Sequence, residues 1–158
     1  MRWADPDSIH LTLKFLGDVT PDQLEQVKTA AQRAAEACSG LSLQTAGLGC
    51  FPNFQRPKVV WVGVEGQRDR LAALRDRVEG AIAPLGFATE ERPFNPHLTL
   101  GRTKTKERRV LAVIGDAVQA AQESANARWE NTHLSLMQST LTPSGAVYTA
   151  LAAFPLKS

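Results

Sequence analysis

The sequence lacks the features that mark several large classes of protein. Among its 158 residues are only two cysteines, Cys38 and Cys50, which are not at a metal-binding spacing, so neither a disulfide framework nor a zinc site is expected. No apolar run approaches the roughly 20 residues that span a bilayer. The first residues also lack the apolar stretch of a signal peptide. We therefore expect a cytoplasmic protein whose two cysteines are inert, small hydrophobic residues.

A strong excess of charge of one sign is also missing. The chain has 18 Lys+Arg against 16 Asp+Glu, a formal net charge of +2. This balance permits an anionic ligand but does not demand a nucleic acid. With 43% hydrophobic and 22% charged residues, the composition is that of a globular protein, and the length fits one domain over residues 1–158.

Hydrophobic periodicity predicts an α+β fold with a mixed, mainly antiparallel sheet. Alternating apolar residues predict strands at residues 8–16, 41–45 and 58–64, and also at 97–101, 129–141 and 146–154, with a turn joining the last two. Helical spacing predicts helices that begin at Pro21 and end near Ser39, run from Leu71 to Ile82, and run from Arg108 to Gln122. Residues 47–57, rich in glycine, proline and asparagine, are expected to form a loop.

One tetrapeptide, His-Leu-Thr-Leu, occurs twice, at residues 10–13 and 97–100. Residues i and i+2 of a strand lie on one face, about 6–7 Å apart. Two such strands side by side would therefore line a cleft with His10, Thr12, His97 and Thr99. One histidine can accept a proton while the other donates one near neutral pH, and threonine hydroxyls can donate to phosphate oxygens.

This set of side chains suits phosphoryl transfer without a metal on a strained cyclic phosphodiester. The spacing leaves open which histidine is the acid and which is the base. Motifs for other chemistries are missing from the sequence, including a phosphate-binding glycine loop, a nucleophile elbow and a dinucleotide fingerprint.

The segments around both copies resemble the 2H phosphoesterase superfamily, which is named for two His-x-Thr-x motifs. The resemblance is greatest to its RNA 2′,3′-cyclic phosphodiesterase branch, also called the 2′-5′ RNA ligase-like family. It rests on Arg2-Trp3 with residues 8–17, on residues 93–102, on a middle segment at residues 51–61, and on a C-terminal hairpin at residues 139–148.

The resemblance implies a bilobal, pseudo-twofold fold with helices on the outside and a central cleft, to which each lobe contributes one motif. It implies hydrolysis of RNA 2′,3′-cyclic phosphodiester ends to 2′-phosphomonoesters, with 2′-5′ ligation as the reverse reaction. By family convention His10 is the proton donor and His97 the proton acceptor, while Thr12 and Thr99 hold the phosphate. No metal or other cofactor is implied.

The chain departs from the family pattern at its start. Family members usually have an apolar strand and a helix before the Arg-Trp pair, and here Met1 directly precedes it. A missing strand would expose apolar surface and an unpaired sheet edge, so we expect aggregation or strand-swapped dimers. We expect RNA ends or nucleotide cyclic phosphates as ligands, with no membrane and no obligate protein partner.

Four further residues are candidates for substrate binding. Lys14 lies on the His10 face if the strand alternates strictly. Arg102 lies on the face opposite His97 by the same rule, unless a bulge at Gly101 redirects it. Phe51 is a candidate for stacking on a nucleobase, with packing at the interface of the lobes as the alternative. Tyr148 is a candidate for packing or for a hydrogen bond at the edge of the cleft.

Two other features have competing interpretations. His133 lies in a similar sequence, His-Leu-Ser-Leu, but in the hairpin, so we assign it a structural or surface role. The run from Arg102 to Arg109 carries five basic residues and could be an RNA-phosphate track or a solvated loop. The alternative functions are a phosphodiesterase for small 2′-5′ or cyclic nucleotides and an RNA-end binding module without turnover.

Overall fold

A computed structural model describes residues 1–124 and 126–158 of the chain. Its contacts divide the chain into two compact units, as expected of a bilobal α+β protein. The first unit contains residues 1–12, 43–66 and 95–129, and the second contains residues 13–42, 67–94 and 130–158. The assignment of the whole chain to a single domain stays a prediction. None of the described helices is long and apolar enough to cross a membrane.

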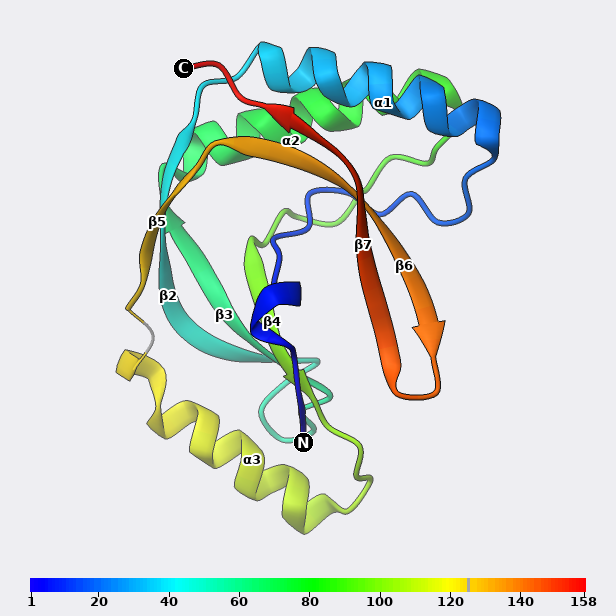
Figure 1. The fold of residues 1–158 in the computed structure, drawn as a ribbon. Helices are drawn as coiled ribbons and strands as arrows, with labels where there is room; N and C mark the ends of the chain where they lie inside the picture. The colour runs from blue at the N-terminus through cyan, green and yellow to red at the C-terminus, as the bar shows by residue number, and fades with distance from the viewer. Residues whose placement is uncertain (125) are drawn as a thin grey trace. The chain divides into compact units, whose positions relative to one another are not determined.

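Most of a five-stranded sheet belongs to the first unit (Figure 1). The order of its strands is β1-β4-β3-β2-β5, and β4 pairs antiparallel with both β1 and β3. The strands are β1 (Arg2–Trp3), β2 (Leu41–Phe51), β3 (Val59–Gly66), β4 (His97–Arg102) and β5 (Arg128–Asn131). The second histidine motif is therefore on an internal strand of this sheet.

The two faces of β3 differ in burial. Val60, Val62 and Val64 are buried, whereas the residues between them are half-buried, the period of two expected of a strand. Helix α3 (Arg108–Ala120) contributes Val118 to a cluster with Cys50 and Val60. The buried face of β3 thus anchors the sheet, and the opposite face carries Trp61.

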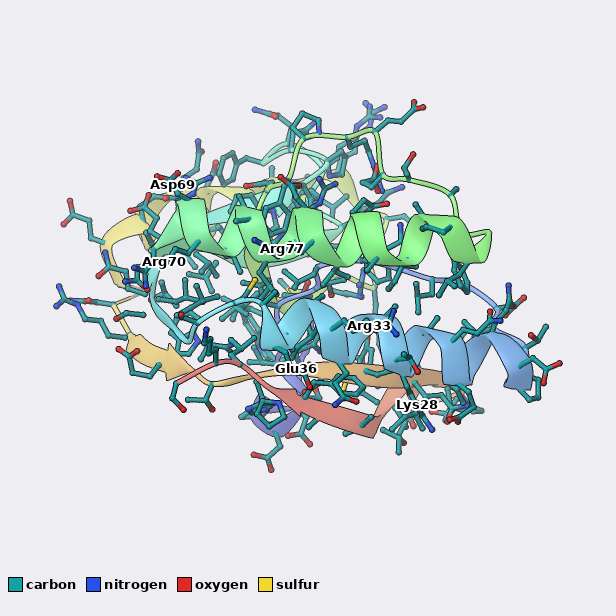
Figure 2. All side chains as sticks on the ribbon, turned by 90° about the horizontal axis from the view of Figure 1, so that it is seen from above. Lys28, Arg33, Glu36, Asp69, Arg70 and Arg77 are labelled. Carbon is teal, nitrogen blue, oxygen red and sulfur yellow. The ribbon has the colours of Figure 1, made fainter. Side chains whose placement is uncertain are left out.

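The second unit contains two helices, α1 (Pro21–Glu36) and α2 (Arg68–Ile82), which lie side by side (Figure 2). Thr20 and Gln23 form a capping box at the start of α1, as the Thr-Pro-Asp sequence predicts. One side of each helix is buried and apolar, including Val27 and Ala35 of α1 and Leu74 of α2. Charged residues labelled in Figure 2 are spread along both helices: Lys28, Arg33, Glu36, Asp69, Arg70 and Arg77.

The second unit also contains the predicted hairpin, β6 (His133–Thr142) paired antiparallel with β7 (Gly145–Pro155). Four apolar side chains on it are exposed, with Leu141 the most exposed at 85%, followed by Val147, Leu151 and Met137. Exposed apolar surface is thus present on this hairpin, while strand-swapped dimers remain a prediction that size-exclusion chromatography would test.

Three of the predicted boundaries are wrong. Residues 8–16 do not form a strand, because a 3-10 turn, η1 (Pro6–Ser8), interrupts the chain and only Leu11 then bridges to Leu98. Strand β2 continues to Phe51 instead of ending at Thr45, since Gly47 adopts φ 68° at a register shift and pairing resumes beyond it. The strand predicted over residues 129–141 is two strands, β5 and β6, separated at Thr132.

Two further 3-10 turns follow helices, η2 (Ala83–Leu85) after α2 and η3 (Gln122–Ser124) after α3. At the start of η3, the side chain of Gln122 hydrogen-bonds both the backbone N–H and the backbone carbonyl of Leu48 in β2. These bonds tie the end of α3 to the sheet of the first unit.

Candidate active site

The two histidine motifs meet in the first unit. Leu11 and Leu98, the second residues of the two motifs, form an antiparallel bridge. Neighbours of a bridged antiparallel pair run in opposite order, so His10 lies toward Thr99 and Thr12 toward His97. Because side chains alternate, these four residues share the face opposite the two leucines. Diagonal neighbours in antiparallel pairs are roughly 7–8 Å apart, so the bridge brings His10 and His97 close to each other.

The two imidazoles are held in the same way. Nδ1 of His10 lies 2.7 Å from the carbonyl oxygen of Ser8, and Nδ1 of His97 lies 2.7 Å from that of Asn95. A carbonyl only accepts, so Nδ1–H is the donor in both bonds. In the neutral form of each ring, Nε2 is then the nitrogen that carries no hydrogen. Each motif therefore supplies its orienting group from the residue two positions upstream.

The first motif depends on a short turn. The Asp5 side chain accepts a hydrogen bond from the Asp7 N–H at 3.0 Å, and the Asp5 carbonyl accepts from the Ser8 N–H at 2.9 Å. This turn follows β1, which pairs with the far end of β4. The chain thus leaves β4 at Asp5, turns, and returns to it at Leu11, and Ser8 is thereby placed to hold His10.

The second motif lies in regular structure with aromatic rings around it. The centroids of Phe51 and His97 are 5.1 Å apart in an edge-on arrangement, those of Trp61 and His97 are 5.8 Å apart, and those of Phe51 and Trp61 are 5.1 Å apart. The Trp61 indole lies over Gly49, where a Cβ atom would come within 2.2–2.6 Å of the ring. Phe51 therefore packs against the predicted base, and Gly49 makes the space for Trp61.

A bulge in β4 redirects Arg102, as the sequence analysis required for its role. Trp61 pairs with Thr99 and Val60 with Gly101, so Leu100 is an extra residue on β4. Arg102 pairs with Val59, two residues from Trp61 on β3. Arg102 therefore lies on the same face as His97 and Thr99.

Lys14 has other partners. Its Nζ lies 2.6 Å from Oε1 of Glu79 and 2.8 Å from the carbonyl oxygen of Ala88, and its side chain is only 4% exposed. The nearby Glu90 accepts hydrogen bonds from Arg92, which lower its pKa to about 2. These contacts favour a structural role for Lys14 in the second unit over the predicted contact with phosphate, since its ammonium is already paired.

The division into units also bears on two expectations from the family resemblance. Both His-x-Thr pairs belong to the first unit, and the boundary falls after Thr12, so the two motifs are not distributed one to each unit. Tyr148 lies in β7 of the second unit, paired with Ser139. Its part in the site stays a prediction.

Behind the site, Trp61 borders a cavity of about 450 Å³ that is also lined by Leu48, Cys50, Phe54 and Gln119. Burial raises the pKa of the Cys50 thiol, in keeping with the inert role expected of it. Trp61 Nε1 is buried and has no hydrogen-bond partner among the described residues. Within the same residues, no three His, Cys, Asp or Glu side chains cluster in a way that could hold a metal ion.

The place of Trp61 beside His97 was not predicted from the sequence, where Trp61 is only the last residue of the middle segment at residues 51–61. Its signal was present, since a lone aromatic residue in a run of valines lies on the face opposite Val60 and Val62. The alternation of residues along β3 does not indicate which face of the sheet carries the histidine motifs. That required the register between β3 and β4.

Comparison with known proteins identifies the family. The family model described as the 2′-5′ RNA ligase superfamily matches residues 4–142. An RNA 2′,3′-cyclic phosphodiesterase from Archaeoglobus fulgidus is 35% identical over 157 residues, covering 98% of this chain and 83% of the relative. One from Aeropyrum pernix is 32% identical over 156 residues, covering 96% and 84%.

Solved structures agree with these relatives. The crystal structure of TT0787 of Thermus thermophilus superposes with a TM-score of 0.79 at 26% identity, covering 98% of this chain and 81% of that one. E. coli LigT complexed with NADP+ gives a TM-score of 0.73 at 26% identity, covering 99% and 81%. The chain belongs to the 2′-5′ RNA ligase superfamily.

Proposed function

We propose that this protein is an RNA 2′,3′-cyclic phosphodiesterase that hydrolyses the cyclic end to a 2′-phosphomonoester. The observation that carries the proposal is the antiparallel bridge between Leu11 and Leu98, which brings both histidine–threonine pairs to one face. The names of the relatives support the substrate class, since those from Archaeoglobus fulgidus and Aeropyrum pernix are RNA 2′,3′-cyclic phosphodiesterases.

The proposed reaction is an acid–base displacement at phosphorus. His97 Nε2 takes a proton from water as the water oxygen forms a bond to phosphorus. The bond from phosphorus to the 3′ oxygen breaks, and His10 gives that oxygen its Nε2 proton. The products are a 2′-phosphomonoester and a free 3′-hydroxyl. Exchange with solvent then returns both imidazoles to their starting protonation states.

Four other side chains on the same face would bind the substrate. Thr12 and Thr99 donate hydrogen bonds to the two non-bridging phosphate oxygens. Their hydroxyl groups are neutral, so they bind the phosphate without adding charge to the site. Arg102 adds a cation to the phosphate. Phe51 keeps the His97 ring in place by its edge-on contact and presents an aromatic surface to the terminal base.

The acid and base roles rest on the family convention, because the two imidazoles have matching Nδ1 partners. In 2′-5′ ligation an RNA 5′-hydroxyl replaces water. His97 takes its proton as the 5′ oxygen bonds to phosphorus, and His10 again protonates the departing 3′ oxygen. In the reverse reaction, cleavage of a 2′-5′ linkage, the roles exchange: His10 takes the proton of the attacking 3′-hydroxyl and His97 protonates the leaving 5′ oxygen.

A small nucleotide is the second candidate substrate. The structure of E. coli LigT complexed with NADP+ supports it, because that relative holds a free nucleotide. An enzyme of this type would hydrolyse a mononucleotide cyclic phosphate as fast as an RNA end. The proposal also includes a cytoplasmic location, with Cys38 and Cys50 as free thiols of the kind that reducing compartments maintain.

The test is hydrolysis of a short RNA ending in a 2′,3′-cyclic phosphate in the presence of EDTA, with the product identified by phosphorus NMR. We expect a 2′-phosphomonoester, and no product from His10→Ala or His97→Ala. Loss of activity on chelation would contradict the metal-free mechanism. RNA binding that requires both histidines, without turnover by the parent protein, would instead establish the binding-module alternative.

A further inference from the structure

The start of the chain places a second arginine beside the proposed site. Arg2 pairs with Arg102 in the register of β1 and β4, so the two side chains lie on one face of the sheet. The next pair supports this assignment, because a Cβ atom at Gly101 would lie 3.0 Å from Cε3 of Trp3. Trp3 therefore occupies the Gly101 face, and both arginines point to the opposite one.

That opposite face carries the histidine motifs. Arg102 pairs with Val59 and Thr99 with Trp61, and these two β3 residues are separated by one pleat repeat, about 7 Å. The arginine pair therefore lies one repeat further along the sheet than the row containing Thr99. The backbone of the arginine pair thus lies one repeat beyond a phosphate held between the histidines, a distance that the long Arg102 side chain spans, and Arg2 lies beside it for the next phosphate.

The charge at this position is unbalanced. Arg2 and Arg102 are both exposed, and no ion pair with a carboxylate is formed by either one in the part of the chain that the structure describes. Like charges directly opposite in an antiparallel pair repel each other. An anion lying between two guanidinium groups would remove that repulsion and accept hydrogen bonds from both.

We propose that Arg2 binds the phosphodiester upstream of the reacting end, and that this contact makes an RNA chain a better substrate than a mononucleotide. The inference rests on the proposed function and goes further, because it assigns substrate length to one residue. The basic side chains of Lys104 and Lys106, exposed just beyond β4, extend the positive charge in the same part of the first unit. Phosphate contacts of this kind position a nucleic acid without reading its sequence.

The experiment compares two substrates that end in the same nucleoside 2′,3′-cyclic phosphate, a mononucleotide and a short oligoribonucleotide. In Arg2→Gln we expect the ratio of oligonucleotide to mononucleotide kcat/KM to fall about tenfold, the size of one charged hydrogen bond. The dependence of oligonucleotide binding on salt should become shallower by about one unit of log–log slope. Arg102→Gln should lower kcat/KM for both substrates.

Arg33→Gln is the matched control, because it removes the same charge from the exposed surface of α1 and should leave the substrate ratio unchanged. An equal loss on both substrates in Arg2→Gln would overturn the assignment, as would no loss on either. If the parent protein turns over neither substrate, the proposed function fails. Fluorescence anisotropy with the oligonucleotide still decides the role of Arg2, since unchanged affinity in Arg2→Gln refutes it.

Discussion

The two histidine motifs have the same four residues but different backbone support. The second lies on β4, which is hydrogen-bonded to β3 along all of its length and to β1 at one end. The first is an irregular segment with one bridge, at Leu11, and it depends on the Asp5 turn for its direction. Both nevertheless orient the imidazole through a carbonyl two residues upstream, at the same 2.7 Å distance.

This difference shows that the motif itself orients the imidazole, whereas the surrounding contacts determine how firmly the motif is held. The local bond from Nδ1 to the i−2 carbonyl orients the ring in either setting, since both of its partners lie within three consecutive residues. The second motif adds ring contacts with Phe51 and Trp61, whereas the first is tied to the sheet by a single bridge. We therefore expect changes around the second motif to affect stability and changes around the first to affect activity.

The largest expected effect comes from the histidines themselves. His10→Ala and His97→Ala should each lower kcat/KM for a cyclic-phosphate RNA by about 10²–10⁴-fold, the usual contribution of a general acid or base. Both variants should keep the parent's far-ultraviolet circular dichroism. His133→Ala is the control and should be fully active, because that histidine is exposed on β6. If either motif proves dispensable, the paired acid–base mechanism is wrong.

The pH profile sharpens the same comparison. When one imidazole must be neutral and the other protonated, kcat/KM passes through a maximum and falls on both sides. Each His→Ala variant should lose one limb of that profile in its residual activity. A profile that keeps both limbs in His10→Ala would show that another group supplies the acid.

The threonines come next in size. Replacing Thr12 or Thr99 by valine removes one hydrogen bond to a charged phosphate, and a cost of about 1.5–3 kcal/mol corresponds to roughly a 10–100-fold loss in kcat/KM. Thr→Ser at either position should restore most of the activity, because the hydroxyl returns. The two losses should be similar despite the different backbone support. A loss confined to Thr99→Val would mean that the first motif holds no phosphate oxygen.

The free energy of unfolding should be sensitive to changes beside the second motif. In Gly49→Ala the new methyl group meets the Trp61 ring within 2.2–2.6 Å, so we expect a loss of about 1–3 kcal/mol in the free energy of unfolding. Gly80→Ala in α2 is the matched control, since a Cβ atom there has no neighbour within 4 Å. That variant should gain about 0.5–1 kcal/mol, and urea titration measures both. Equal stability of the two variants would show that the Trp61 packing does not support the second motif.

The smallest effect is expected at the turn before the first motif. Asp5→Ala removes the bond from the Asp7 N–H and should reduce the free energy of unfolding by about 0.5–1 kcal/mol. Because Ser8 follows directly, kcat should fall more than this small destabilisation would suggest, with KM little changed. Asp5→Asn retains an acceptor oxygen and should recover kcat. An unchanged kcat in Asp5→Ala would leave the turn without a role in positioning His10.

Much of the fold could be predicted from periodicity. The three helices, the central strand β3 and the C-terminal hairpin follow from patterns within a few residues of sequence, because local propensity and burial agree there. The strand expected at residues 8–16 was wrong although its alternation is regular. Alternation predicts which side chains share a face, but a strand also needs a partner over its whole length, and η1 shifts the chain before Leu11.

The sequence by itself determined the residues of the proposed site, since two identical His-Leu-Thr-Leu segments with matching flanks specify both the residue types and their alternation. Only the tertiary structure decided how these residues meet. The register of Leu11 with Leu98, the extra residue Leu100, and the pairing of Arg2 with Arg102 all join segments far apart in the chain. Such long-range pairing depends on packing across the whole sheet, and a slip of one residue would turn each side chain to the other face.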